Sequence, residues 1–278
     1  MIAKLRDAFR PESSYRAFFI SILTFALAYG LYKGIIDNYL AEVAGMSEFD
    51  KGVSEFFREL PGLALIFVLA ALYELSAERI YQVGALIMLA GMAMQSFIPS
   101  TKVLVIIAIF IYSLGEHIQL GMRNTLTLEY AKEGKSGVAL GRQSAMYQIG
   151  MLAGYFVVIA LFAVLGNRQS LYKPVFLMSA SIIFLGFLSS LRIKGNSKPD
   201  PSRRRFYFHK KYTKYYMLEL FYGARKQIFF TFGPYVLVLF YGASAMNISV
   251  LFAVSSVCSY FASPLVGRII DRFGYKIG

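Results

Sequence analysis

Three apolar segments of the sequence contain ionisable residues, and the segment that starts at Val103 has the most informative spacing. In a helix, Glu116 and Arg123 lie on one face two turns apart, and His117 lies beside that face. These residue types can bind a proton and an anion. We interpret Glu116, shared with His117, as a proton site and Arg123 as an anion-binding cation. The alternative is a buried ion pair that only orders the surrounding helices.

The second segment combines one carboxylate with two consecutive cations. Glu219 and Lys226 share a helix face with Tyr222, and Arg225 precedes Lys226. Consecutive cations in an apolar stretch need water, a carboxylate or a solute as a partner. The Gly-Pro pair at 233–234 predicts a break or kink, and interrupted helices are frequent at binding sites inside membranes. Glu219 is therefore a further proton-coupling candidate, and Tyr222, Arg225 and Lys226 are binding candidates.

The third segment holds Tyr29, Lys33 and Asp37, which form a stripe at intervals of four residues. Lys33 and Asp37 lie near the outer end of the predicted helix and fit an interfacial ion pair as well as a binding role. No metal-ligand spacing, nucleophile elbow or phosphate loop is present, and the chain has only 2 histidines. The sequence thus predicts no metal, no cofactor and no enzyme. The alternative at these residues is an intramembrane enzyme built on Glu116 and His117.

Composition indicates which elements must position these residues. Of the 278 residues, 57% are hydrophobic and 16% are charged, whereas soluble domains have roughly 45–50% and about 25%. At about 20 apolar residues per crossing, this length predicts roughly eight membrane helices. The predicted crossings, or their apolar cores, are 17–32, 60–73 with an outer end in 54–59, 80–101, the segment from 103, 143–167, 174–191, and two helices within 227–267 that are divided at 242–247.

The distribution of lysine and arginine predicts the orientation of these helices. With the N-terminus inside, 20 of these residues lie on the inner side and 5 on the outer side, which places the N-terminus and the basic segment 192–214 in the cytoplasm. The 5 outer residues are Lys51, Arg58, Lys102, Arg168 and Lys173. This bias explains most of the net charge of +13, so we predict contact with anionic lipid and no nucleic-acid partner. The expected location is a bacterial-type cytoplasmic membrane, with the chain as an integral, multi-pass protein.

A string of glycines and charges follows the eighth predicted crossing. Its members are Gly267, Asp271, Arg272, Gly274 and Lys276. Gly267 permits close helix packing, Gly274 permits a tight turn, and the charged residues can form a latch. A generic hairpin on the positive side of the membrane explains the basic residues but neither the glycines nor the aspartate. The string resembles the cytoplasmic signature loop of the major facilitator superfamily.

The resemblance implies a second copy of this loop, because the halves of such transporters are internal repeats. Glu78 and Arg79 match the acidic and basic pair 193 residues before Asp271 and Arg272, although both glycines are absent. This degenerate copy indicates a duplication of six helices. The resemblance also implies that Asp271 packs against the start of the fifth helix, near residues 137–142.

The predicted fold class is an all-α membrane protein of the major facilitator type, with a complete first six-helix half and two helices of the second half. The expected parts are a cytoplasmic N-terminal segment (1–14), the first half (15–192), a basic cytoplasmic linker (193–213) and a partial second half (214–278). A second half as long as the first would extend roughly 110 residues further. We therefore expect a C-terminally truncated member of the family.

Two glycines of the fifth predicted helix, Gly150 and Gly154, form a G-x-x-x-G pattern that predicts close packing against a neighbouring helix. The family's antiporter motif has a proline after the second glycine. This chain has Tyr155 at that position, so the helix does not support an antiporter.

The resemblance implies a secondary transporter that moves a small solute by alternating access. From the residues themselves we predict that protons are coupled through Glu116. In this superfamily the first, fourth and seventh helices line the central cavity. The cations there are Lys33, Arg123, Arg225 and Lys226, and the anions are Asp37, Glu116 and Glu219. One extra cation favours an anionic or polar solute. The alternative is a non-transporting truncated membrane protein, or a helix bundle that binds a partner; oligomeric state stays open.

Overall fold

The structure is a helical bundle. A computed structural model describes residues 8–10, 14–194, 209–214, 216–218, 221 and 228–274. The α-helices are α2 (Tyr15–Glu42), α3 (Glu48–Ala71), α4 (Ala77–Phe97), α5 (Lys102–Tyr130), α6 (Ser136–Leu165), α7 (Tyr172–Ser190), α9 (Gly233–Tyr241) and α10 (Ala245–Phe273). The short turns are η1 (Gln169–Leu171), η2 (Lys210–Tyr212) and the π-helix η3 (Ile228–Phe232). The predicted all-α class is confirmed for this part of the chain.

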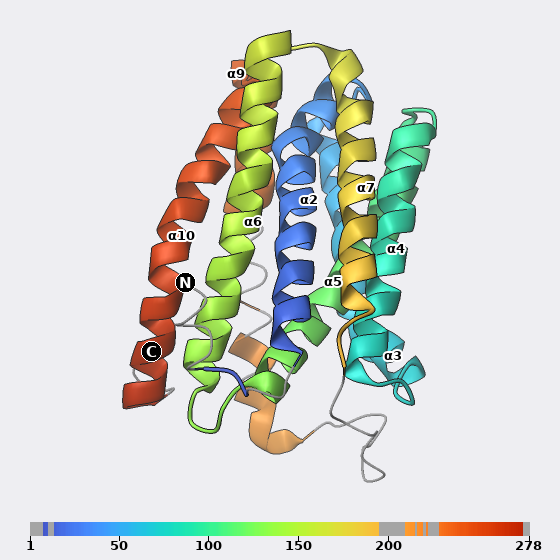
Figure 1. Cartoon of the computed structure of the whole chain (residues 1–278). Helices are drawn as coiled ribbons and strands as arrows, with labels where there is room; N and C mark the ends of the chain where they lie inside the picture. Colours follow the sequence, from blue (N-terminus) through green and yellow to red (C-terminus); the bar gives the residue numbers. More distant parts are fainter. Residues whose placement is uncertain are drawn as a thin grey trace.

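Helix α2 lies at the centre of the bundle, between α6 and α7 in Figure 1, and also contacts α9 and α10. On one side α10 packs along α6, and on the other α7 packs along α4. Helix α5 contacts both α4 and α3. The turns α2–α3, α4–α5 and α6–α7 mark the end that the charge bias predicts to face outward. This end is called the outer end below, and the opposite end the inner end.

Six of the described helices are long and apolar enough to cross a membrane: α2, α4, α5, α6, α7 together with η1, and α10. Helix α3 is not among them because its outer half contains several charges. Helix α9 has only 9 residues within the described part of the chain. The first helix extends beyond its predicted apolar core 17–32, since α2 continues to Glu42. Its charged outer part lies inside the bundle, where Lys33 and Asp37 are paired.

Helix α3 also starts earlier than its predicted outer end at residue 54. A capping box starts it at Glu48: the Ser47 hydroxyl accepts a hydrogen bond from the Asp50 N–H (3.3 Å), and the Asp50 carboxylate accepts one from the Ser47 N–H (2.9 Å). The first turn is thereby anchored outside the apolar stretch. Residues 51–59 become part of a regular helix that faces the bundle.

The predicted interruption and division of the last apolar stretch are both confirmed. The π-helix η3 ends at Phe232, and α9 starts at Gly233 with Pro234 in its first turn, where the missing N–H of proline costs no hydrogen bond. Gly242 ends α9 with φ +63°, a left-handed conformation that favours glycine. Ser244 then caps α10 by accepting a hydrogen bond from the Asn247 N–H (3.3 Å).

Glycines allow α6 to pack closely against two neighbours. A Cβ atom at Gly150 would lie 2.6 Å from the carbonyl oxygen of Leu23 in α2. At the inner end, a Cβ atom at Gly137 would lie 2.6 Å from the carbonyl oxygen of Gly267 in α10. The close packing predicted from the G-x-x-x-G pattern and from Gly267 is thus confirmed. It sets the order α2, α6, α10 in the bundle.

Candidate functional site

Glu116 lies in the middle of α5, where four helices bring ionisable groups together. Its largest electrostatic interaction with a charged side chain is with Arg58 of α3. The next are with His117, Glu59 and Arg123. Tyrosines in its surroundings are Tyr29 and Tyr32 of α2, Tyr112 of α5 and Tyr147 of α6. A half-buried carboxyl group among opposite charges can change its protonation state without becoming an isolated buried ion.

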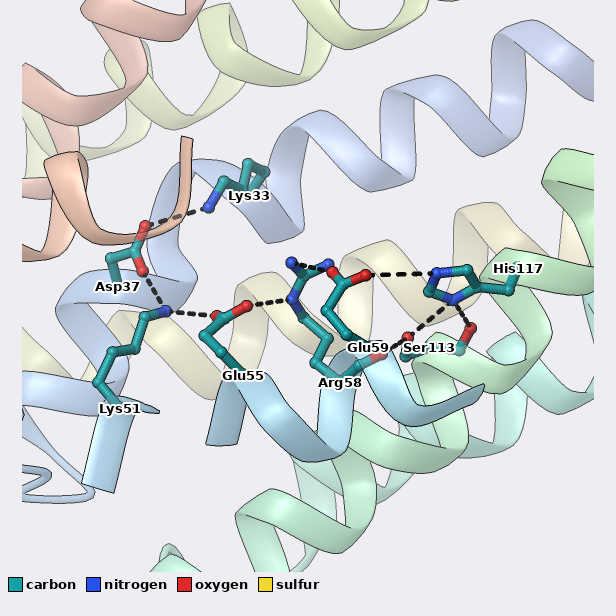
Figure 2. Close-up of polar contacts among 8 residues, drawn as sticks. All are labelled: Lys33, Asp37, Lys51, Glu55, Arg58, Glu59, Ser113 and His117. Atoms are coloured by element: carbon teal, nitrogen blue, oxygen red, sulfur yellow. Dashed lines mark hydrogen bonds and ion pairs between the residues drawn. The ribbon is translucent and has the colours of Figure 1, made fainter. Parts of the chain in front are cut away.

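His117 of α5 reaches the neighbouring helix α3. Its Nδ1 lies 2.9 Å from the Ser113 carbonyl oxygen, so the Nδ1–H donates to that oxygen, as Figure 2 shows. Nε2 is then the nitrogen that can gain or lose a proton, and it lies 3.8 Å from a Glu59 carboxylate oxygen. Glu59 therefore supplies a carboxylate beside Nε2, in addition to the Glu116 carboxylate that the sequence analysis pairs with His117.

Arg123 lies two turns after Glu116 on the same face of α5, and its guanidinium packs on an aromatic ring. The guanidinium carbon is 4.1 Å from the ring centroid of Tyr147, which in turn is 6.2 Å from the ring of Tyr29. The Nε atom of Arg123 is buried and has no hydrogen-bond partner among the described residues. A half-buried guanidinium with an unused donor can bind a polar or anionic group.

Lys33 and Asp37 form a buried ion pair rather than an interfacial one. Their Nζ and Oδ2 atoms are 3.3 Å apart, and Asp37 is 1% exposed. The second Asp37 oxygen accepts a hydrogen bond from the Lys51 ammonium at 2.7 Å. Lys33 therefore has a carboxylate partner that it shares with a residue of α3.

Four charged residues of α3 belong to the site although the sequence analysis does not predict them there. It assigns Lys51 and Arg58 to the outer side of the membrane and gives no role to Glu55 and Glu59. The structure corrects this: Lys51 is 1% exposed and binds both Asp37 and Glu55. These four charges follow one another at intervals of four, three and one residues, which places them on one helix face. This spacing is the signal in the sequence that could have predicted their place in the site. A hydropathy profile includes the free-energy cost of placing each charge in the membrane, but it does not include the ion pairs that offset this cost.

Some predicted candidates lie outside the described residues. They are Glu219, Tyr222, Arg225, Lys226 and Lys276. Among the residues that are described, no group of three or more His, Cys, Asp or Glu side chains is arranged to hold a metal ion.

Asp271 of the signature loop binds the start of α6, as the resemblance implies. Its two carboxylate oxygens accept hydrogen bonds from the N–H groups of Gly137 (2.7 Å) and Val138 (2.8 Å). These N–H groups belong to the first turn of α6, where no helical partner exists and the helix dipole favours an anion. Gly274 ends α10 with φ +79°. The Arg272 guanidinium lies 5.2 Å from the ring centroid of Phe273.

The degenerate first copy of the loop lies between α3 and α4. Glu78 and Arg79 are in the first turn of α4. One Glu78 carboxylate oxygen is buried without a hydrogen-bond partner in the described structure, while Arg79 is exposed. The copy therefore differs from the second one in contacts as well as in its missing glycines.

Asp271→Ala is expected to raise the hydrogen-exchange rate of the Gly137 and Val138 amides about tenfold, since the loss of these charge-assisted bonds costs about 1–1.5 kcal/mol. Peptide-resolved exchange of the whole chain in detergent measures the effect. Arg272→Ala is the matched control and should leave both amides unchanged. Equal protection in Asp271→Ala and the unmodified chain would show that the contact contributes nothing to the start of α6.

Comparison with known proteins adds a family and a fold. A sequence model of the Major Facilitator Superfamily matches residues 18–277. Two similar solved structures are the nucleoside transporter NupG, as its D323A mutant (TM-score 0.66, 16% identity, 95% of this chain and 69% of that chain), and NupG itself (TM-score 0.64, 16% identity, 94% and 68%). Among curated protein sequences, none matches this chain. The arrangement of helices is thus that of known transporters.

Proposed function

Because the chain belongs to the major facilitator superfamily of membrane transporters, we propose that it moves a small polar or anionic solute by alternating access, coupled to protons at Glu116. The observation that carries the proposal is the position of Glu116 among Arg58, His117 and Arg123. A carboxyl group inside a helix bundle can take up a proton on one side of the membrane and release it on the other when its surroundings change.

The nature of the solute is inferred from the groups around Glu116. Arg123 offers a guanidinium stacked on Tyr147, and Tyr29 adds a second ring. The α3 residues add two cations and two anions to the predicted balance, so the excess of one cation remains. This supports a polar or anionic solute. Both similar structures are of a nucleoside transporter, so nucleosides are suitable neutral probes and nucleotides suitable anionic ones.

The same proposal places the N-terminus and the linker 193–213 in the cytoplasm, with 15–192 as the first half and 214–278 as part of the second. The charge bias supports this orientation. It becomes stronger because Lys51 and Arg58 lie in α3 instead of outer loops.

Glu116→Gln is expected to reduce proton-driven solute uptake at least about tenfold, because glutamine cannot bind and release a proton. Uptake of radiolabelled nucleosides and nucleotides is measured in liposomes that contain the 278-residue chain, with an imposed pH gradient. Glu133→Gln, which removes an exposed carboxylate between α5 and α6, is the matched control and should retain uptake.

Proton-driven uptake that persists in Glu116→Gln would overturn the coupling role of Glu116. Absence of any solute flux through this chain would favour the alternative, a non-transporting membrane protein.

A further inference from the structure

A continuous series of ion pairs runs along α3 and connects the proton site with the outer end of the bundle. In Figure 2 each charge contacts the next, from Lys33 to His117. The Lys51 ammonium is 2.7 Å from Asp37 and 2.9 Å from Glu55. Arg58 is 2.6 Å from Glu55 and 2.5 Å from Glu59. We call the residues Asp37, Lys51, Glu55, Arg58 and Glu59 the α3 ion ladder.

Every interior member of the ladder is shared between two partners of opposite charge. Lys51 binds two carboxylates, Glu55 binds two cations, and Arg58 again binds two carboxylates. Buried charges are stable only when they are paired, so a change in one pair alters how strongly the next is held. The ladder can therefore pass an electrostatic change along α3 over about two turns.

The inner end of the ladder meets the groups that titrate in the proposed transport cycle. Glu59 lies between Arg58 and His117 Nε2, which is 3.8 Å from its carboxylate. Arg58 also has the largest electrostatic interaction with Glu116. The groups that face Glu116 and His117 are Arg58 and Glu59 from α3, Tyr29 and Tyr32 from α2, Arg123 and Tyr112 from α5, and Tyr147 from α6.

The outer end of the ladder meets the second half of the chain. The Lys51 ammonium lies 5.2 Å from the ring centroid of Tyr235 in α9, and the Tyr235 hydroxyl donates to the Met46 carbonyl oxygen at 2.6 Å. Asn38, next to Asp37, donates to the Ala243 carbonyl oxygen at 2.8 Å. The Lys33 ammonium lies 5.2 Å from the ring of Phe252 in α10. These contacts hold α9 and α10 against α2 and the α2–α3 turn.

We propose that the α3 ion ladder positions the contact between Tyr235 and the α2–α3 turn according to the protonation of His117 and Glu116. A proton on His117 draws Glu59 toward the imidazolium, so Arg58 loses part of its attraction to Glu59 and binds Glu55 more strongly. Glu55 then binds Lys51 less strongly, and the contact between Tyr235 and the α2–α3 turn loosens. The inference rests on the proton coupling proposed above and adds Lys51, Glu55 and Arg58 as positioning residues.

A cysteine reporter at the outer contact tests the proposal. Met46 is 2% exposed, so Met46→Cys in a Cys258→Ser background reacts with a maleimide only when the outer end opens. The alkylation rate of the 278-residue protein in detergent is divided at each pH by the rate of the same thiol after unfolding in SDS, which removes the titration of the thiol itself. We expect the normalised rate to rise about fivefold from pH 8 to pH 6.

Glu55→Gln should remove this rise and leave the normalised rates at the two pH values within about twofold. Glu74→Gln, which neutralises an exposed carboxylate after α3, is the matched control and should retain it. Tyr235→Phe removes the hydrogen bond to Met46, so it should raise the rate at both pH values and keep the rise. If Glu55→Gln does not fold, Glu55→Asp retains the charge, is too short to reach both cations, and should reduce the rise.

A rise as large as that of the parent protein in folded Glu55→Gln or Glu55→Asp would overturn the ladder as a positioning element. So would a rate in the parent protein that is constant or falls toward pH 6. Both results leave the proposed transport intact, since proton-driven uptake in Glu116→Gln is measured separately. Conversely, suppose that the alkylation rate rises in the parent protein and not in Glu55→Gln, while proton-driven uptake is unchanged in Glu116→Gln. These results together would support the ladder and refute Glu116 as the coupling site.

Discussion

Lys51→Met is expected to lower the free energy of unfolding by about 2–3 kcal/mol, because it removes the buried cation that Asp37 and Glu55 share and leaves each carboxylate with one other cation. Lys51 is 1% exposed and contacts Asp37 and Glu55 at 2.7 and 2.9 Å. Methionine occupies a similar volume, so the loss reports on charge rather than on a cavity. Helix content is followed by circular dichroism while SDS is titrated into mixed micelles, which gives the free energy of unfolding.

Lys102→Met provides the control for this prediction. Lys102 and Asp50 are 2.6 Å apart, but their side chains are 47% and 26% exposed, so water screens the pair and its loss should change stability little. Equal effects of the two substitutions would show that Lys51 is not buried as an ion. Lys51→Arg should recover part of the stability, because arginine can still bind two carboxylates.

Gly154→Val is expected to cost about 3 kcal/mol of stability, because there is no room for a side chain between α6 and α2. A Cβ atom at this position would overlap the Leu27 carbonyl oxygen and lie 2.8 Å from the Leu31 backbone nitrogen. Both atoms belong to the backbone of α2, which is packed on several sides and cannot move away alone. The same SDS titration measures the loss.

Gly52→Ala is the matched control, since it adds a methyl group to a helical glycine that has nothing within 4 Å of the added atom. Alanine is the better helix former, so this change should stabilise the chain by up to about 1 kcal/mol. If Gly154→Val were as well tolerated as Gly52→Ala, the close approach of α2 and α6 would be wrong.

Much of the fold could be predicted because its determinants are local in sequence. The break at Gly233 and the turn at Gly242 follow from the backbone preferences of glycine and proline. The spacing of Gly150 and Gly154 places both on one helix face, which is sufficient to predict a close neighbour. The contact of Asp271 with α6 came from a resemblance rather than from a local rule.

The site was predicted only in part, because its pairs join residues of different helices. Glu116 and Arg123 could be placed on one face by counting within α5. The contact of His117 with Glu59 is not predicted, since the imidazole reaches Glu59 across the α3 interface, where Nε2 lies 3.8 Å from the carboxylate. Which helix lies opposite a given face depends on how the bundle packs, and helical periodicity within one segment does not contain that information.

The sequence by itself determined that this protein is a helical membrane protein of the major facilitator type, where most of its helices lie and where two of them approach closely. These properties depend on apolar length, glycine spacing and a signature string, which are all read along one segment. Only the tertiary structure decided that Lys51, Glu55 and Arg58 belong to the interior. A charge enters a bundle only when a partner compensates for the loss of water, and that partner is supplied by helix crossing rather than by neighbours in sequence.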